Sequence, residues 1–205
     1  AWNRQGHIYR QLKQFDDAEK AYKKVQSLAN QGTANKAFSL ANFGLLNQSK
    51  GNLEEAEKAF IQALEIYTNI ENEAGIASVS ENLARMYKNT EQFEKAETNF
   101  LKALEIHQKQ EQPQNIATIH SALGSLYQTM KLSNKAQTHY EKALEINLNN
   151  NFKENIASLY SNLGILAEQN GKLEKSKEYF QKSLELNKDT KRDNATADQY
   201  GNLAI

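Results

Sequence analysis

The sequence predicts an all-α fold, a solenoid of antiparallel helix pairs with five pairs and the start of a sixth. The first observation is a repeat, because small residues recur 38 residues apart once and then at four equal steps of 40. The second is that the chain has one proline and nine glycines in 205 residues and is rich in residues that favour helices. The third is that Val, Ile and Thr never cluster into alternating runs, so no strands are expected. The repeating small residues are Gly6, Gly44, Ala84, Gly124, Gly164 and Ala204.

Two helices are predicted in each unit, because the apolar residues of 76–87 and those of 93–104 each recur at helical spacing. Sixteen residues after each small residue comes an aromatic column, and twelve residues after it comes an alanine column. The aromatic column is Tyr22, Phe60, Phe100, Tyr140 and Phe180, and the alanine column is Ala18, Ala56, Ala96 and Ala136, with Ser176 in the last unit. We expect the small columns to let the two helices approach closely, and the rings of Phe60, Phe100 and Phe180 to fill the gap to the next unit.

The turn between the two helices of the third unit is predicted at 88–92. In the second and fifth units this turn contains Gly51 and Gly171, and glycine just past a helix end supplies the left-handed cap. Asn52 then resembles the N-cap of the following helix, with Glu55 as its reciprocal partner.

The repeat makes the whole chain, 1–205, a single predicted array. Its units lie at approximately 1–35, 36–75, 76–115, 116–155 and 156–195, followed by a partial unit at 196–205. Both ends fall inside a unit, so we expect the chain to be a fragment of a longer protein.

These columns resemble the tetratricopeptide repeat. The matching positions are Trp2, Gln5, Gly6, Tyr9, Ala18 and Tyr22 in the first unit and Leu123, Gly124, Tyr127, Ala136 and Tyr140 in the fourth. The period of 40 is longer than the usual period of about 34, and the repeat-ending proline is absent. Longer units of this kind are similar to those of kinesin light chains, cell-polarity adaptors and bacterial peptide-sensing regulators. The resemblance implies a right-handed superhelical solenoid that binds polypeptides.

Charge and composition narrow the classes of partner. Lys+Arg and Asp+Glu balance at 25 each, so the whole molecule does not attract nucleic acid or anionic lipid. The longest stretch without charged side chains, 112–130, is interrupted by polar residues and is not expected to enter a membrane. The absence of cysteine excludes disulfides and thiolate metal sites and favours the cytoplasm. Richness in Asn, Lys and Gln favours a bacterial origin.

Catalytic and metal-binding patterns are not found, so no enzyme activity, metal or cofactor is predicted. The four histidines, His7, His107, His120 and His139, lack metal-ligand spacing with a carboxylate on the same helical turn. His120 and His139 belong to one unit and can approach each other, and we interpret them as packing or surface residues. No glycine-rich phosphate loop and no Ser/His/Asp set occurs.

Candidate binding residues follow from the face that the resemblance assigns to partners, the concave side of the first helices. They are Asn42, Asn82, Arg85, Lys88, Asn89, Ser121, Ser125, Gln128 and Asn162. Asn42, Asn82 and Asn162 share one column with Asn202, and amides both donate and accept, so such a ladder suits a peptide backbone. The alternative interpretation is a column of solvated polar positions in an Asn-rich chain.

Basic residues give the N-terminal half of this face a positive character that would suit an acidic partner, unless they are ordinary surface charges. These residues are Arg4, His7, Arg10, Arg85 and Lys88. The sequence thus predicts a scaffold that binds a peptide segment of a partner protein in a concave groove. Two alternatives stay open: a regulatory or sensory arm of a larger bacterial signalling protein, and a structural spacer that self-associates through exposed array ends.

Overall fold

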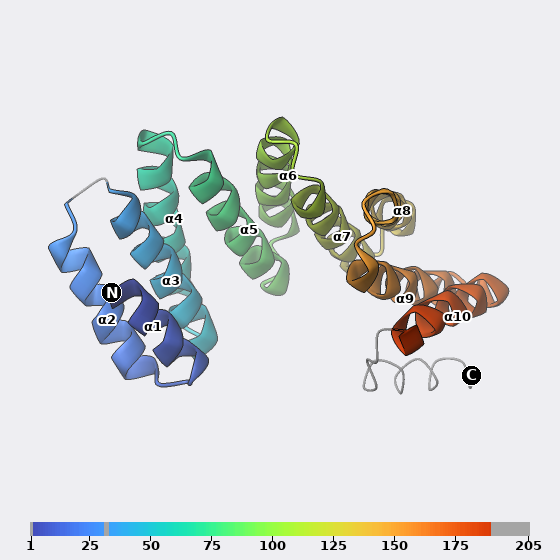
Figure 1. Ribbon diagram of the computed structural model, residues 1–205, viewed down its shortest axis with the longest axis horizontal. Helices are drawn as coiled ribbons and strands as arrows, with labels where there is room; N and C mark the ends of the chain where they lie inside the picture. The colour runs from blue at the N-terminus through green and yellow to red at the C-terminus, as the bar shows by residue number, and fades with distance from the viewer. Residues whose placement is uncertain (1, 31–32, 190–205) are drawn as a thin grey trace. The chain divides into compact units, whose positions relative to one another are not determined.

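The computed structural model describes residues 2–30 and 33–189, and within these ranges the chain forms ten α-helices and no strand (Figure 1). Each helix from α3 onward has 17 residues, in keeping with the constant period. The helices are α1 (Trp2–Gln11), α2 (Phe15–Leu28), α3 (Ala34–Lys50), α4 (Leu53–Asn69), α5 (Glu73–Asn89), α6 (Phe93–Lys109), α7 (Pro113–Thr129), α8 (Ser133–Asn149), α9 (Lys153–Gln169) and α10 (Leu173–Asp189). The expected partial unit at 196–205, with Asn202 and Ala204, lies outside the described residues.

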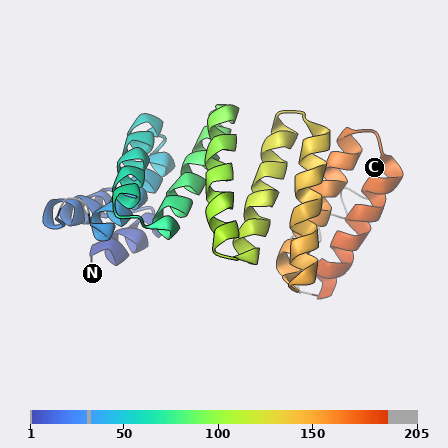
Figure 2. The same ribbon diagram turned by 90° about the horizontal axis from the view of Figure 1, so that it is seen from above.

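The helices belong to two compact units, unit 1 (Ala1–Ile106) and unit 2 (His107–Ile205). In unit 1, α1 packs against α2 and α3 against α4, and α3 also touches both α1 and α5. In unit 2, α7 packs against α8 and α9 against α10, and α7 touches α9 (Figure 2). Within each unit, therefore, the first helices of successive pairs are neighbours.

Close packing inside each pair depends on the small column. A Cβ at Gly44 would lie 2.7 Å from the ring of Phe60, and one at Gly124 would lie 2.6 Å from the ring of Tyr140. The ring and the glycine belong to the same pair in both cases, and Gly164 faces Phe180 in the same way. The small residues thus allow close approach as predicted, but the rings occupy the space within their own pair, where sequence reasoning placed them in the gap to the next.

The turns between helices use a left-handed residue. Gly51 and Gly171 adopt φ of +82° and +72°, which confirms the predicted glycine caps. Six further turns use residues with a side chain, at φ between 50° and 61°: Lys13, Glu71, Glu91, Glu111, Lys131 and Asn151. Each side-chain-bearing residue in this region costs about 1–2 kcal/mol, so the repeat tolerates strain at these turns.

The predicted side-chain cap at Asn52 is wrong. Asn52 occupies the N-cap position, and its carbonyl accepts from Ala56 N at 3.0 Å, but its side chain makes no capping bond. Its Nδ2 is turned instead toward Asn47 Oδ1, at a distance of 3.5 Å. Side-chain caps occur at Asn72, whose Oδ1 accepts from Gly75 N at 2.8 Å, and at Thr33.

The contact between successive pairs is built from an aromatic ring in one place and from polar side chains in another, at equivalent positions of the repeat. In unit 1 the ring of Tyr67 in α4 lies so close to Gly75 in α5 that a Cβ at Gly75 would approach to 2.4 Å. In unit 2 the equivalent residues, 80 positions later, are Asn147 and Asn155, and Asn155 Nδ2 donates to Asn147 Oδ1 at 3.1 Å. A large ring opposite glycine and two short amides therefore serve the same junction.

None of the helices in the described part of the chain combines the length and the apolar character that a bilayer crossing requires.

Candidate functional site

The first-helix face of each unit, formed by the side chains of α1, α3 and α5 in unit 1 and of α7 and α9 in unit 2, contains the predicted binding residues. In unit 1, Arg85 and Asn89 of α5 are exposed, and Asn82 and Lys88 are half-buried. Arg85 donates to Glu81 Oε2 at 2.8 Å, one helical turn away. Loss of hydration lowers the pKa of Lys88. The face at α5 therefore offers a cation already paired with a carboxylate and a second cation in partly desolvated surroundings.

The amide at Asn42 is largely buried and bonded within its own helix. Its side chain is only 7% exposed, and its Nδ2 donates to Phe38 O of the same helix at 2.8 Å. The equivalent amides in α5 and α9, Asn82 and Asn162, are half-buried and keep contact with solvent. The three members of the column thus differ in accessibility, and their role in binding stays a prediction.

In unit 2 the predicted residues meet across two first helices. Gln128 of α7 accepts from the hydroxyl of Tyr140 at 2.8 Å, and its Nε2 donates to Oε1 of Gln169 in α9 at 2.9 Å. Ser121 and Ser125 lie half-buried on the same helix as Gln128. The amide bridge ties neighbouring first helices together, so Gln128 has a structural use that the sequence did not indicate.

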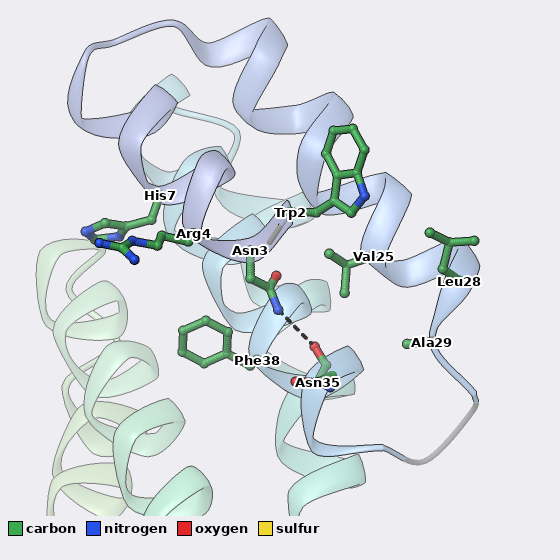
Figure 3. A pocket seen from close by; sticks show the side chains of 9 residues that line it. All are labelled: Trp2, Asn3, Arg4, His7, Val25, Leu28, Ala29, Asn35 and Phe38. Atoms are coloured by element: carbon green, nitrogen blue, oxygen red, sulfur yellow. Dashed lines mark hydrogen bonds between the residues drawn. The ribbon is translucent and has the colours of Figure 1, made fainter.

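A pocket of about 720 Å³, which the sequence analysis did not address, opens between α1, α2 and α3 of unit 1 (Figure 3). Of its lining, only Arg4 and His7 had been assigned to the binding face. The residues that line it are Trp2, Asn3, Arg4, His7, Val25, Leu28, Ala29, Asn35 and Phe38. The available signal was the pair of large apolar residues, Trp2 and Phe38, near the starts of two first helices.

His120 and His139 do approach each other, with their Nδ1 atoms 3.0 Å apart between α7 and α8. Burial, followed by the nearby His139 and Lys142, lowers the pKa of His120 from 6.5 to about 4. His120 is therefore expected to be uncharged at neutral pH, and one ring donates to the other. In the described ranges, no group of three His, Cys, Asp or Glu side chains is placed to hold a metal ion.

Comparisons with solved structures show the same fold. BtubC (BKLC) from P. vanneervenii matches with a TM-score of 0.81 and 22% identity, over 91% of this chain and 78% of that one. A signal transduction ATPase with a tetratricopeptide repeat sensor, from Pyrococcus horikoshii, matches with a TM-score of 0.86 and 22% identity, over 95% and 30%. Repeats of a Podosopora anserina protein assigned to the kinesin light chains match with a TM-score of 0.79 and 15% identity, over 93% and 95%. These matches confirm the all-α solenoid.

A comparison with curated protein sequences gives no match. Two family models described as tetratricopeptide repeat match the chain, one over residues 1–69 and 75–149 and the other over residues 157–190. The matched ranges include both first-helix faces and the pocket of unit 1. The fold is a non-catalytic scaffold for protein interaction, and the chain belongs to the tetratricopeptide repeat family.

Proposed function

We propose that the chain binds a peptide segment of a partner protein along the first-helix face, in the concave groove that the repeat family implies. The observation that carries the proposal is the adjacency of first helices: α3 touches α1 and α5 in unit 1, and α7 touches α9 in unit 2. Each unit thereby gathers the polar side chains of several first helices on neighbouring elements.

The chemistry of this face supports a polypeptide ligand. Amides such as Asn82 and Asn162 both donate and accept, which matches the alternating N–H and C=O groups of an extended backbone. Lys88 adds positive charge beside them, and Arg85 adds a guanidinium that is paired with Glu81. Serine hydroxyls at Ser121 and Ser125 can donate or accept as a ligand requires.

The test begins with peptides selected from a displayed random library on the wild-type chain. Their affinity is then measured by fluorescence anisotropy for a face variant, Asn82→Ala/Arg85→Ala/Asn89→Ala. A matched control, Gln62→Ala/Lys102→Ala, removes two exposed side chains from the second helices α4 and α6. The proposal expects the face variant to lose at least about tenfold in affinity, or 1.4 kcal/mol, while the control keeps it.

Equal affinity for the wild-type chain and the face variant would refute the proposal for α5. Unit 2 has its own test in Gln128→Ala/Asn162→Ala, which also removes the amide bridge to Gln169, so helicity must be checked by circular dichroism. If the variants change the oligomeric state and no peptide affinity, the chain is a self-associating spacer.

A sensory arm of a larger signalling protein is a second candidate. It is supported by the Pyrococcus horikoshii structure, in which a tetratricopeptide repeat sensor belongs to a signal transduction ATPase and this chain spans 30% of that protein. A peptide ligand found by the selection would be the sensed signal in that case. We also propose a non-enzymatic role in a bacterial cytoplasm, with no cofactor and no nucleic-acid partner.

A further inference from the structure

The pocket of unit 1 has one apolar and one cationic side. Figure 3 shows Arg4 and His7 side by side at one edge. Trp2, Val25 and Leu28 lie on the opposite side of the same pocket. A ligand that fills it must therefore present an apolar group and, next to it, a group that tolerates positive charge.

Large apolar surface is left open to water around this pocket. Trp2 is 46% exposed, Leu28 63% and Phe38 50%. Single exposed apolar side chains are ordinary, whereas several that border one cavity mark an interaction site. The volume of about 720 Å³ lies within the range of protein pockets that hold ligands.

The lining of the pocket carries positive charge, from Arg4. Neither α1 nor α3 contains an acidic residue, and no acidic residue lines the pocket. The intervening helix α2 carries Asp16, Asp17 and Glu19, none of which lines the pocket. Asp17 is paired with Lys20, and Glu19 is paired with Lys23 and Lys50. An anionic ligand group would meet the Arg4 guanidinium without a competing carboxylate in the lining.

A buried acceptor in the lining also lacks a donor. Asn3 Nδ2 donates to Asn35 O at a long 3.5 Å, and among the described residues no donor reaches Asn3 Oδ1, although that atom is buried. A buried oxygen without a partner is rare in folded proteins. Because that oxygen is closed off from solvent, it adds no contact for a ligand in the pocket.

We propose that this pocket anchors the partner segment by a bulky apolar side chain, with an acidic residue next to it against Arg4. The apolar side chain packs between Trp2 and Phe38. The inference rests on the proposed function and adds to it the chemistry of the partner and its point of attachment.

The single tryptophan of the chain gives this pocket its own signal, because Trp2 is the only residue excited at long ultraviolet wavelength. Three acetylated peptides serve as probes: a leucine between glutamates, a leucine between lysines, and an alanine between glutamates. Leucine and alanine do not emit, so any change in emission reports on Trp2. The expected result is a blue shift with the leucine–glutamate peptide, whose affinity exceeds that of the other two by at least about tenfold.

Two variants make the assignment specific. Arg4→Glu is expected to reverse the preference in favour of the lysine-flanked peptide, and Phe38→Ala is expected to weaken binding of both leucine peptides. Lys24→Glu is the matched control, because it makes the same change of charge at an exposed residue of α2 outside the pocket. Unchanged circular dichroism shows that each variant is folded.

Equal affinity for the three peptides, or no binding of the leucine–glutamate peptide up to about 1 mM, would overturn the inference. So would a Trp2 emission that shifts with protein concentration alone, because a second copy of the chain would then cover the pocket. If library-selected peptides bind and lose affinity with the α5 face variant while Trp2 emission stays constant, the pocket assignment fails and the proposed function stands. If the library yields no peptide that binds the wild-type chain, the pocket assignment and the proposed function both fail.

Discussion

Acidification from pH 6.5 to pH 4 is expected to destabilise unit 2 through the His120–His139 pair. His120 is 7% exposed, and its Nδ1 lies 3.0 Å from that of His139, so one ring must donate and the other must accept. Protonation of both rings would place two donors and two positive charges face to face. Lys142 adds a further positive charge near His120.

The size of the stability loss follows from the difference between the pKa of His120 in the folded chain and in the unfolded chain. The pKa of His120 is lowered, chiefly by burial, from 6.5 to about 4. Between these values the unfolded chain binds a proton that the folded chain does not, so stability is full above pH 6.5 and falls as the pH drops toward 4. At 1.36 kcal/mol for each pKa unit, the loss is at most about 3 kcal/mol.

The matched control comes from the next pair of the same unit. There the equivalent positions are Tyr160 and Tyr179, whose rings stack with centroids 6.1 Å apart. The double variant His120→Tyr/His139→Tyr installs this arrangement in α7 and α8 and removes the titrating pair. Stability is measured by urea unfolding, followed by circular dichroism, at pH 7.5, 6.5, 5.5 and 4.5.

The wild-type chain should lose more stability than the double variant over this range, with most of the difference between pH 6.5 and 4.5. Carboxylates that titrate at the acid end are common to both proteins and cancel in the difference. A parallel loss in the two proteins would refute the reasoning. So would an NMR titration in which the ring protons of His120 give a midpoint at or above 6.5.

Two substitutions test the packing and the turns. Gly44→Ala should lower the free energy of unfolding by about 1–3 kcal/mol, because the new Cβ would lie 2.7 Å from the ring of Phe60. Alanine also gains about 1 kcal/mol of helix propensity, which opposes the packing cost. Thermal unfolding measures the net change, and a melting temperature at or above that of wild type would contradict the prediction that the packing cost is the larger of the two. Glu91→Gly should stabilise by up to about 1 kcal/mol, because glycine adopts the φ of 59° without strain. The same measurement should show a loss for Glu94→Gly within α6, and a loss at Glu91 would disprove the strain argument.

The fold was predictable because the signals that specify it are local and repeated. Helical spacing of apolar residues and the 40-residue period predict paired helices without any knowledge of distant contacts. The left-handed turns at Gly51 and Gly171 follow equally from the local demand for positive φ. The predicted capping role of Asn52 was wrong because its side-chain amide is turned toward Asn47 Oδ1 and makes no bond to the backbone of its own helix.

The candidate site was predictable only in part. The sequence identified the helices that carry Asn82, Arg85 and Gln128, because periodicity assigns each residue to a helix face. It did not indicate which amides are already used within the protein, as at Asn42, because that depends on a rotamer and on the distance to Phe38 O. The pocket of unit 1 left only the two large apolar residues Trp2 and Phe38 as a signal in the sequence, because its lining depends on how three helices pack.

The sequence by itself determined the all-α repeat, the pairing of helices and the columns of small residues and rings, since these depend on spacing along one chain and on side-chain size, but it did not place the rings against the small residues of their own pair. Only the tertiary structure decided the low pKa of His120 and the unpaired oxygen of Asn3, because both depend on burial. Burial is a property of how separate helices pack. Residues that are alike in sequence, such as Asn42 and Asn82, therefore acquire different exposure and different chemistry in the folded chain.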